Sequence, residues 1–184
     1  MTAKVQSRRA CLEIRTSWGV IRVGAEGSKI TSCTLPRLAA EPHKRFKWIG
    51  ASIVDADHQG TAILRRAEKF VRSMFDGKPV EPPAFELPPA TPFTVRVWRA
   101  LAAIPPGKVL EYGEIAARIG RPGGSRAVGR ACGANPLPLF IPCHRVLPKD
   151  GTLGGFSSGL PWKRLLLDRE KTSGVKASTK SSSR

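Results

Sequence analysis

The chain has 184 residues, 41% of them apolar, which suits one soluble domain or two small ones. No apolar run approaches the length of a membrane span, and the first residues lack the apolar core of a secretory signal, so we expect a cytoplasmic protein. Lys and Arg (31 residues) outnumber Asp and Glu (14 residues), and the net charge of +17 favours a polyanionic partner.

Residues 9–38 are predicted to form β structure. Apolar side chains alternate with polar ones in runs that are separated by Gly-containing turns, and these runs are Cys11–Arg15, Val20–Val23 and Ile30–Leu35. A small antiparallel sheet is the expected result.

A loop and a helix are expected to complete the N-terminal half. The basic and aromatic segment 43–48, within an irregular stretch from 39 to 50, is interpreted as a loop that either connects strands or faces a nucleic acid. From Thr61 to Phe75 apolar residues recur at helical spacing, and Gly77 ends the helix. We therefore predict an N-terminal domain over residues 1–77.

The proline-rich segment 78–92 is predicted to be an extended linker, because proline fixes φ and cannot continue a hydrogen-bonded ladder. Helical spacing then returns over Phe93–Ala103, Tyr112–Ile119 and Ser125–Cys132. The last two helices, joined by a tight Gly- and Pro-containing turn, form a helix-turn-helix. We place a C-terminal domain at 93–171 and a disordered basic tail at 172–184.

Basic residues outside the tail carry most of the excess charge. The segment from Lys171 onward supplies four of them, namely Lys171, Lys176, Lys180 and Arg184. The remainder belongs to the folded part, which favours nucleic acid as the partner. An anionic membrane is the weaker alternative, because no basic amphipathic helix with an aromatic face is evident.

The stretch Ile141–Leu147 carries the most distinctive chemistry of the chain. It places Cys143 beside His144 within an apolar run, between a proline and an arginine. A thiolate is the nucleophilic form of cysteine, and a neighbouring positive charge or proton-accepting imidazole favours it. A buried cysteine in a strand, with His144 merely satisfied nearby, is the alternative interpretation.

The motif and its surroundings resemble the O6-alkylguanine-DNA alkyltransferases. Upstream, Arg126–Ala131 leads through Asn135-Pro136 into the cysteine, as the DNA-reading helix of that family does. The similar segments that flank these follow the family's order over Pro92 to Glu170, and they are Ile104–Val109, Tyr112–Ala116, Gly154–Ser157 and Leu165–Glu170.

The resemblance implies an α+β protein: an N-terminal domain with a ribonuclease-H-like fold and a C-terminal winged-helix domain. It implies a DNA repair protein that rotates O6-alkylguanine out of double-stranded DNA and transfers the alkyl group irreversibly to Cys143, once per chain. A monomer is expected, associated with the nucleoid in a bacterium. The resemblance leaves open whether O4-alkylthymine is repaired as well.

Residue roles follow from the same resemblance. Cys143 would be the acceptor, His144 the base acting through a water, and Glu170 the group that orients the imidazole. Tyr112 would donate a proton toward guanine N3. Asn135 would couple the DNA-reading helix to the cysteine strand, and Phe156 and Ser157 would contact the substrate, with Phe156 standing where many relatives have tyrosine.

The DNA-facing residues are expected on the Ser125–Cys132 helix. Arg126 resembles the arginine finger that fills the gap left by the rotated base, although a phosphate contact is its alternative. Ala127 and Gly129 are small, which suits close approach to the minor groove, where sequence is not read. We interpret Arg130 as a phosphate contact.

No cofactor and no metal are expected. Cys11, Cys33, His43 and His58 lack a recognisable ligand spacing, and a chain without a secretory signal favours free thiols. Cys132 is interpreted as a small buried residue.

Other functions remain open at the level of sequence. A cysteine hydrolase could use Cys143 and His144, although papain-like enzymes draw these residues from distant positions. A basic winged-helix regulator could carry Cys143 as a structural residue.

Overall fold

The structure is a computed structural model that describes residues 10–78 and 80–171. The predicted tail at 172–184 and residues 1–9 of the predicted N-terminal domain lie outside the described residues. Within the described part, no helix is long and apolar enough to cross a membrane.

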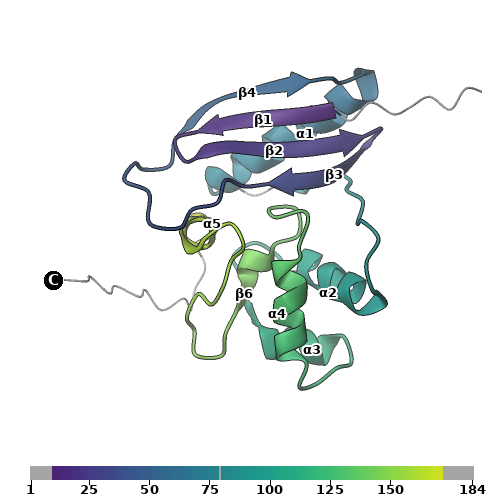
Figure 1. Cartoon of the computed structure of the whole chain (residues 1–184), viewed down its shortest axis with the longest axis vertical. Coiled ribbons are helices and arrows are strands. Elements are labelled where there is room, and N and C mark those ends of the chain that lie inside the picture. Colours follow the sequence, from purple (N-terminus) through teal and green to yellow (C-terminus); the bar gives the residue numbers. More distant parts are fainter. Residues whose placement is uncertain (1–9, 79, 172–184) are drawn as a thin grey trace, which may run out of the picture.

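The N-terminal half is an antiparallel sheet with one helix packed across it (Figure 1). Its strands lie in the order β3-β2-β1-β4 and comprise β1 (Ala10–Thr16), β2 (Gly19–Glu26), β3 (Lys29–Thr34) and β4 (Trp48–Val54). Alternate residues of β1 are buried, among them Leu12 and Ile14, as expected of a sheet with one covered face. The predicted strands within 9–38 are therefore confirmed.

Helix α1 (His58–Phe75) covers the sheet with the predicted apolar face. It begins three residues before the predicted start, because the Asp57 side chain accepts a hydrogen bond from the Gly60 N–H at 2.7 Å and caps the helix. It ends before Gly77, whose φ of 68° suits the left-handed region that glycine adopts most easily.

Strand β4 begins inside the stretch that was predicted to be irregular, so the prediction is wrong for residues 48–50, whereas residues 39–47 form no helix or strand. The strand was missed because Gly50, Ala51 and Ser52 have weak strand propensity. Pairing with β1, where Ile53 lies opposite Leu12, supplies the order that the local sequence lacks. The chain before β4 is a connecting loop fixed to the β1–β2 turn, where the Trp18 indole N–H donates to the Lys44 carbonyl at 2.6 Å.

Residues 84–86 of the proline-rich segment lie along the edge of β3. The Ile30 N–H donates to the Ala84 carbonyl at 3.0 Å, and the Glu86 N–H donates to the Ile30 carbonyl at 2.8 Å. The segment therefore covers a sheet edge that would otherwise present unpaired backbone groups.

The C-terminal half is mainly helical (Figure 1). Its elements are α2 (Pro92–Ala102), β5 (Leu110–Glu111), α3 (Tyr112–Arg118), α4 (Ser125–Gly133), the 3-10 turn η1 (Cys143–Arg145), β6 (Val146–Leu147) and α5 (Leu160–Arg169). The three helices predicted between 93 and 132 are present, and α4 packs against both α2 and α3. The short parallel pair β5–β6 was not predicted.

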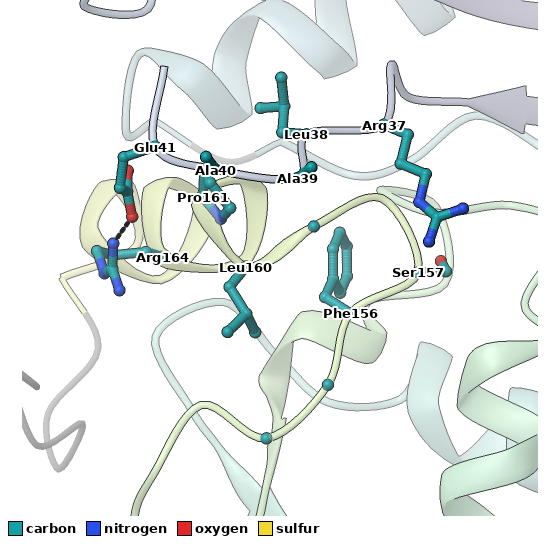
Figure 2. A pocket seen from close by; sticks show the side chains of 13 residues that line it. Arg37, Leu38, Ala39, Ala40, Glu41, Phe156, Ser157, Leu160, Pro161 and Arg164 are labelled. Atoms are coloured by element: carbon teal, nitrogen blue, oxygen red, sulfur yellow. Dashed lines mark ion pairs between the residues drawn. The ribbon is translucent and has the colours of Figure 1, made fainter. Parts of the chain in front are cut away.

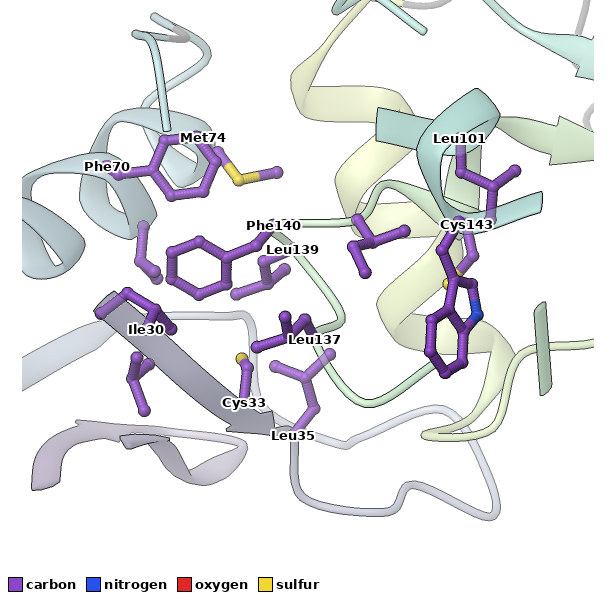
Figure 3. Packing of buried hydrophobic residues seen from close by; sticks show 14 of the residues in the cluster. Ile30, Cys33, Leu35, Phe70, Met74, Leu101, Leu137, Leu139, Phe140 and Cys143 are labelled. Atoms are coloured by element: carbon purple, nitrogen blue, oxygen red, sulfur yellow. The ribbon is translucent and has the colours of Figure 1, made fainter. Parts of the chain in front are cut away.

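One continuous apolar core joins the two halves (Figure 3). The ring of Phe70 on α1 lies 5.1 Å from that of Phe140 in the segment before Cys143. The ring of Trp162 on α5 lies 5.0 Å from that of Trp18, and its indole N–H donates to the Pro36 carbonyl at 2.8 Å. The segment that carries Cys143 is consequently fixed against the N-terminal half.

Candidate active site

Cys143 lies at the start of a 3-10 turn, not in a strand as the sequence suggested. The Cys143 N–H donates to the Ile141 carbonyl at 2.8 Å, and the Arg145 N–H donates to the Pro142 carbonyl at 3.0 Å. These short-range bonds close the chain into a turn, and Pro142 has no N–H to offer a ladder. The turn leaves the buried thiol at the wall of a cavity.

Asn135 holds the turn and the sulfur together. Its Nδ2 donates to the Ile141 carbonyl at 2.8 Å and to Cys143 Sγ at 3.2 Å, and its Oδ1 accepts from the Leu137 N–H at 3.0 Å. The Asn135 N–H also donates to the carbonyl of Cys132, at the end of α4. The predicted coupling of α4 to the cysteine segment is present, with a turn in place of the strand.

The side chain of His144 is fully buried and pairs with Glu170 just after α5. His144 Nε2 lies 2.9 Å from Glu170 Oε1. Arg145 donates hydrogen bonds to the same carboxylate: its Nε lies 2.9 Å from Oε2, and a terminal nitrogen lies 2.7 Å from Oε1. Burial alone would raise the pKa of Glu170, but the hydrogen bonds from His144 and Arg145 prevail and lower it to about 2.

The protonation of His144 follows from these contacts. Burial lowers the pKa of His144 against the opposing effect of the Glu170 carboxylate, so the ring is neutral near pH 7. An ionised carboxylate only accepts hydrogen bonds, so Nε2 carries the proton that faces Glu170. Nδ1 then holds a free lone pair and can act as a base.

Lys163 on α5 is a component of the site that sequence reasoning missed. It is fully buried, and its Nζ donates to the Val146 carbonyl at 2.7 Å and to the Gly155 carbonyl at 3.4 Å. Burial lowers its pKa to about 8. Burial also favours the neutral form of Cys143 and therefore raises the pKa of its thiol. The Asn135 amide and the Lys163 ammonium act in the opposite direction and favour the thiolate.

The cavity in front of Cys143 has a volume of about 410 Å³. It collects the predicted residues Tyr112, Gly129, Phe156 and Ser157 around the sulfur, together with Cys132, Gly133 and Gly155. Cys132 is buried, as predicted, but it also lines this cavity. Burial raises the pKa of Tyr112 to about 12, so its phenol keeps its proton at neutral pH.

The arginines predicted to meet DNA lie outside the cavity. Arg126 and Arg130 are exposed on α4, one turn apart, and Ala127 is half-buried between them. Exposed Arg118 and Arg121 precede them on the α3–α4 pair. Among the described residues, none of these four arginines has an ion-pair partner, so their charge is available to a polyanion.

No metal site accompanies this arrangement in the described ranges. Across residues 10–78 and 80–171, no group of three or more His, Cys, Asp or Glu side chains could hold a metal ion.

The chain matches a known protein family over the segment that contains the site. Residues 92–172 match the model of the 6-O-methylguanine DNA methyltransferase DNA-binding domain. The methylated-DNA–protein-cysteine methyltransferase of Salmonella typhimurium is 54% identical over 80 residues, which are 44% of this chain and 47% of that protein. The Mycobacterium bovis enzyme of the same name is 51% identical over 82 residues, 45% of this chain and 50% of that protein. The match thus spans about half the length of these curated relatives.

Solved structures extend the similarity to the N-terminal half. The Mycobacterium tuberculosis protein OGT in complex with DNA is 34% identical, with a TM-score of 0.68, and the match covers 84% of this chain and 88% of that one. The M. tuberculosis O6-methylguanine methyltransferase is 32% identical, with a TM-score of 0.65 and coverage of 90% and 96%. This protein therefore belongs to the family of O6-methylguanine DNA methyltransferases.

Proposed function

We propose that this protein repairs O6-alkylguanine in double-stranded DNA by moving the alkyl group to Cys143. One observation carries the proposal: Cys143 lines a cavity together with a protonated phenol, and the next residue in the chain, His144, forms a buried pair with Glu170. A soft sulfur at the wall of a cavity is suited to displacement at an alkyl carbon. The M. tuberculosis relative bound to DNA and the curated names of the other relatives support the same substrate class.

The transfer is a single in-line displacement. His144 Nδ1 takes the thiol proton through a water, and the thiolate attacks the alkyl carbon, so that an S–C bond forms while the C–O6 bond breaks. The electron pair of the broken bond passes to the guanine. Glu170 holds the imidazole in the required tautomer and stabilises its charged form, as carboxylates do in catalytic triads.

The departing guanine needs a proton. Tyr112 lines the cavity and keeps its phenolic proton at neutral pH, so it is placed to donate toward guanine N3. Its proton makes guanine leave as a neutral base. Because a thioether is stable and no hydrolytic group faces the sulfur among the cavity residues, each chain reacts once.

The damaged base must leave the duplex to reach this cavity. The N-terminal half fits a ribonuclease-H-like domain in its β3-β2-β1 order and overlying α1, and the C-terminal half fits a winged helix in its α3–α4 pair. In this proposal α4 enters the minor groove, Arg126 fills the gap in the stack, and Arg130 binds a phosphate. Electrostatic attraction by the exposed arginines of α3 and α4 would make binding independent of sequence.

The geometry gives less support to a cysteine hydrolase. A hydrolase uses a direct contact between nucleophile and base. Here the hydrogen-bond partner of Cys143 Sγ among the described residues is Asn135, and no direct hydrogen bond joins the sulfur to the His144 ring. A relay through water fits alkyl transfer.

The proposal is tested by mass spectrometry of peptides after incubation with a duplex that contains O6-methylguanine. We expect one methyl group on the peptide that contains Cys143. The Cys143→Ala variant should gain none while it still binds the lesion-containing duplex. A methyl group on another residue, or continued repair by Cys143→Ala, would refute the assignment of the acceptor.

A further inference from the structure

The lid loop, residues 154–159, separates two cavities. One is the acceptor cavity of about 410 Å³ in front of Cys143. The other lies behind the loop and has a volume of about 600 Å³ (Figure 2). Gly155, Phe156 and Ser157 line both cavities, so this part of the loop is a wall one residue thick.

A strap from the N-terminal half, residues 36–41, forms another part of the wall of the rear cavity. Ala39 and Ala40 of the strap line this cavity together with Phe156 of the lid loop (Figure 2). The strap is fixed to α5 at both ends, because the Trp162 indole donates to the Pro36 carbonyl at 2.8 Å and Glu41 pairs with Arg164.

The two ends of the lid loop are held differently. At its C-terminal end, the Leu38 N–H donates to the carbonyl of buried Ser158 at 2.8 Å. A Cβ added to Gly159 would lie 2.0 Å from the Leu38 carbonyl oxygen, so strap and loop are in close contact there.

The N-terminal end of the lid loop has a weaker attachment. Its hydrogen bond to a buried side chain, among the described residues, is the long one of 3.4 Å from Lys163 Nζ to the Gly155 carbonyl. Gly154 also packs on Pro148, because an added Cβ would lie 2.9 Å from a carbon of that proline. Gly154 has a φ of 62°, and Gly155 follows it, so the backbone at this end is the most permissive of the loop. Movement of the loop about its fixed end would carry Phe156 toward the rear cavity.

We propose that the rear cavity is the space into which Phe156 and its neighbours withdraw when the O6 substituent is larger than methyl. The strap is then the fixed stop that sets the largest group accepted, and O6-benzylguanine serves as the bulky probe of that limit. This inference rests on the proposed function, because it concerns the same acceptor cavity. A methyl group requires no such withdrawal.

The test places larger side chains in the rear cavity by substituting residues of the strap. Ala39→Phe and, independently, Ala40→Phe place a ring on exposed strap positions that line the rear cavity but not the acceptor cavity. Ala62→Phe, on the exposed face of α1, is the matched control. Single-turnover transfer rates are measured on one duplex sequence that carries either O6-methylguanine or O6-benzylguanine, after the folding of each variant has been checked by thermal melting.

We expect the ratio of benzyl to methyl transfer rates to fall by about tenfold in a filled variant, the rate equivalent of a modest overpacking penalty. Methyl transfer and the control variant should match the parent. The inference is overturned if the ratio is unchanged in both filled variants, if both substrates slow equally, or if the parent transfers methyl but not benzyl. A parent protein that transfers neither group would instead refute the proposed function.

Discussion

Glu170 joins three parts of the site at the scale of single residues. Its carboxylate receives hydrogen bonds from His144 and Arg145 and from the Gly107 N–H, and its side chain is 3% exposed. Because its pKa is lowered to about 2, the stability that these bonds contribute is complete above the ordinary pKa of 4.5 and is lost as the pH falls toward 2. The carboxylate thus serves both the chemistry and the fold.

Glu170→Gln should affect both roles. The amide cannot stabilise a charged imidazole and leaves buried Arg145 without its counter-charge, so we expect transfer to slow by about a hundredfold and stability to fall by about 3–5 kcal/mol. Single-turnover kinetics and urea unfolding measure these effects, with exposed Asp168→Asn as the control. A folded Glu170→Gln protein that transfers at the parent rate would show that Glu170 does not support His144.

Tyr112 allows a direct measurement, because it is the single tyrosine of the chain. Burial favours its neutral form, so tyrosinate should appear near pH 12 in the folded protein and near pH 10 in urea. Its contribution to stability is complete below pH 10 and is lost as the pH rises toward 12. Ultraviolet difference absorbance reads this titration, and ionisation near pH 10 in the folded protein would place the phenol in water instead of the cavity.

Single residues also mark the limits of sequence reasoning at the site. The resemblance led to Cys143, His144 and Glu170, which the structure brings together. Lys163 could not be predicted, because a lysine within a helical segment is normally solvated, and only packing beneath the lid loop buries it. The ion pair between Arg145 and Glu170 could not be predicted either, because the two residues are 25 positions apart and no local pattern reveals the contact.

At the scale of elements, α4 lies between the proposed DNA surface and the acceptor. One face carries exposed Arg126 and Arg130, and the other places Gly129 and Cys132 in the cavity. A Cβ on Gly129 would lie 3.9 Å from the Tyr112 ring, an ordinary van der Waals distance, so this position of α4 faces the phenol. DNA contact and pocket shape are therefore coupled through one short helix.

The two arginines of α4 should give different phenotypes. Arg126→Ala should impair transfer from duplex DNA far more than transfer from free O6-benzylguanine, because only the duplex requires extrusion of the base. Arg130→Ala should weaken binding to any duplex and reduce the salt slope of the affinity by about one. Transfer assays on both substrates and a salt titration distinguish them. An equal loss on both substrates for Arg126→Ala would show that Arg126 does not act in the extrusion of the base.

Elements were predictable where local pattern and packing agreed. Alternation in β1 and helical spacing in α1 correspond to the faces that the structure buries. Strand β4 was missed because its small residues depend on β1 for order, and the turn at Cys143 was missed because Asn135, eight residues away, shapes it. The first error comes from a contact that the local pattern does not contain, and the second comes from a short turn at Pro142 that the Asn135 side chain stabilises.

At the scale of the whole molecule, the N-terminal half supports the acceptor site. Phe70 packs on Phe140, the Cys33 N–H donates to the Pro136 carbonyl at 3.1 Å, and the strap holds the C-terminal end of the lid loop. These contacts fix the segments on either side of Cys143 before any substrate arrives. Pre-organisation of this kind suits a protein that has a single opportunity to react.

The stoichiometry of repair tests irreversible transfer to Cys143 most directly. A fixed amount of protein is titrated with an excess of duplex that carries O6-methylguanine, and repaired lesions and the intact-protein mass are followed to completion. We predict that repair stops at one lesion per chain, with one methyl group on every active chain. Repair of many lesions per chain, or repair with an unchanged protein mass, would contradict the proposed mechanism.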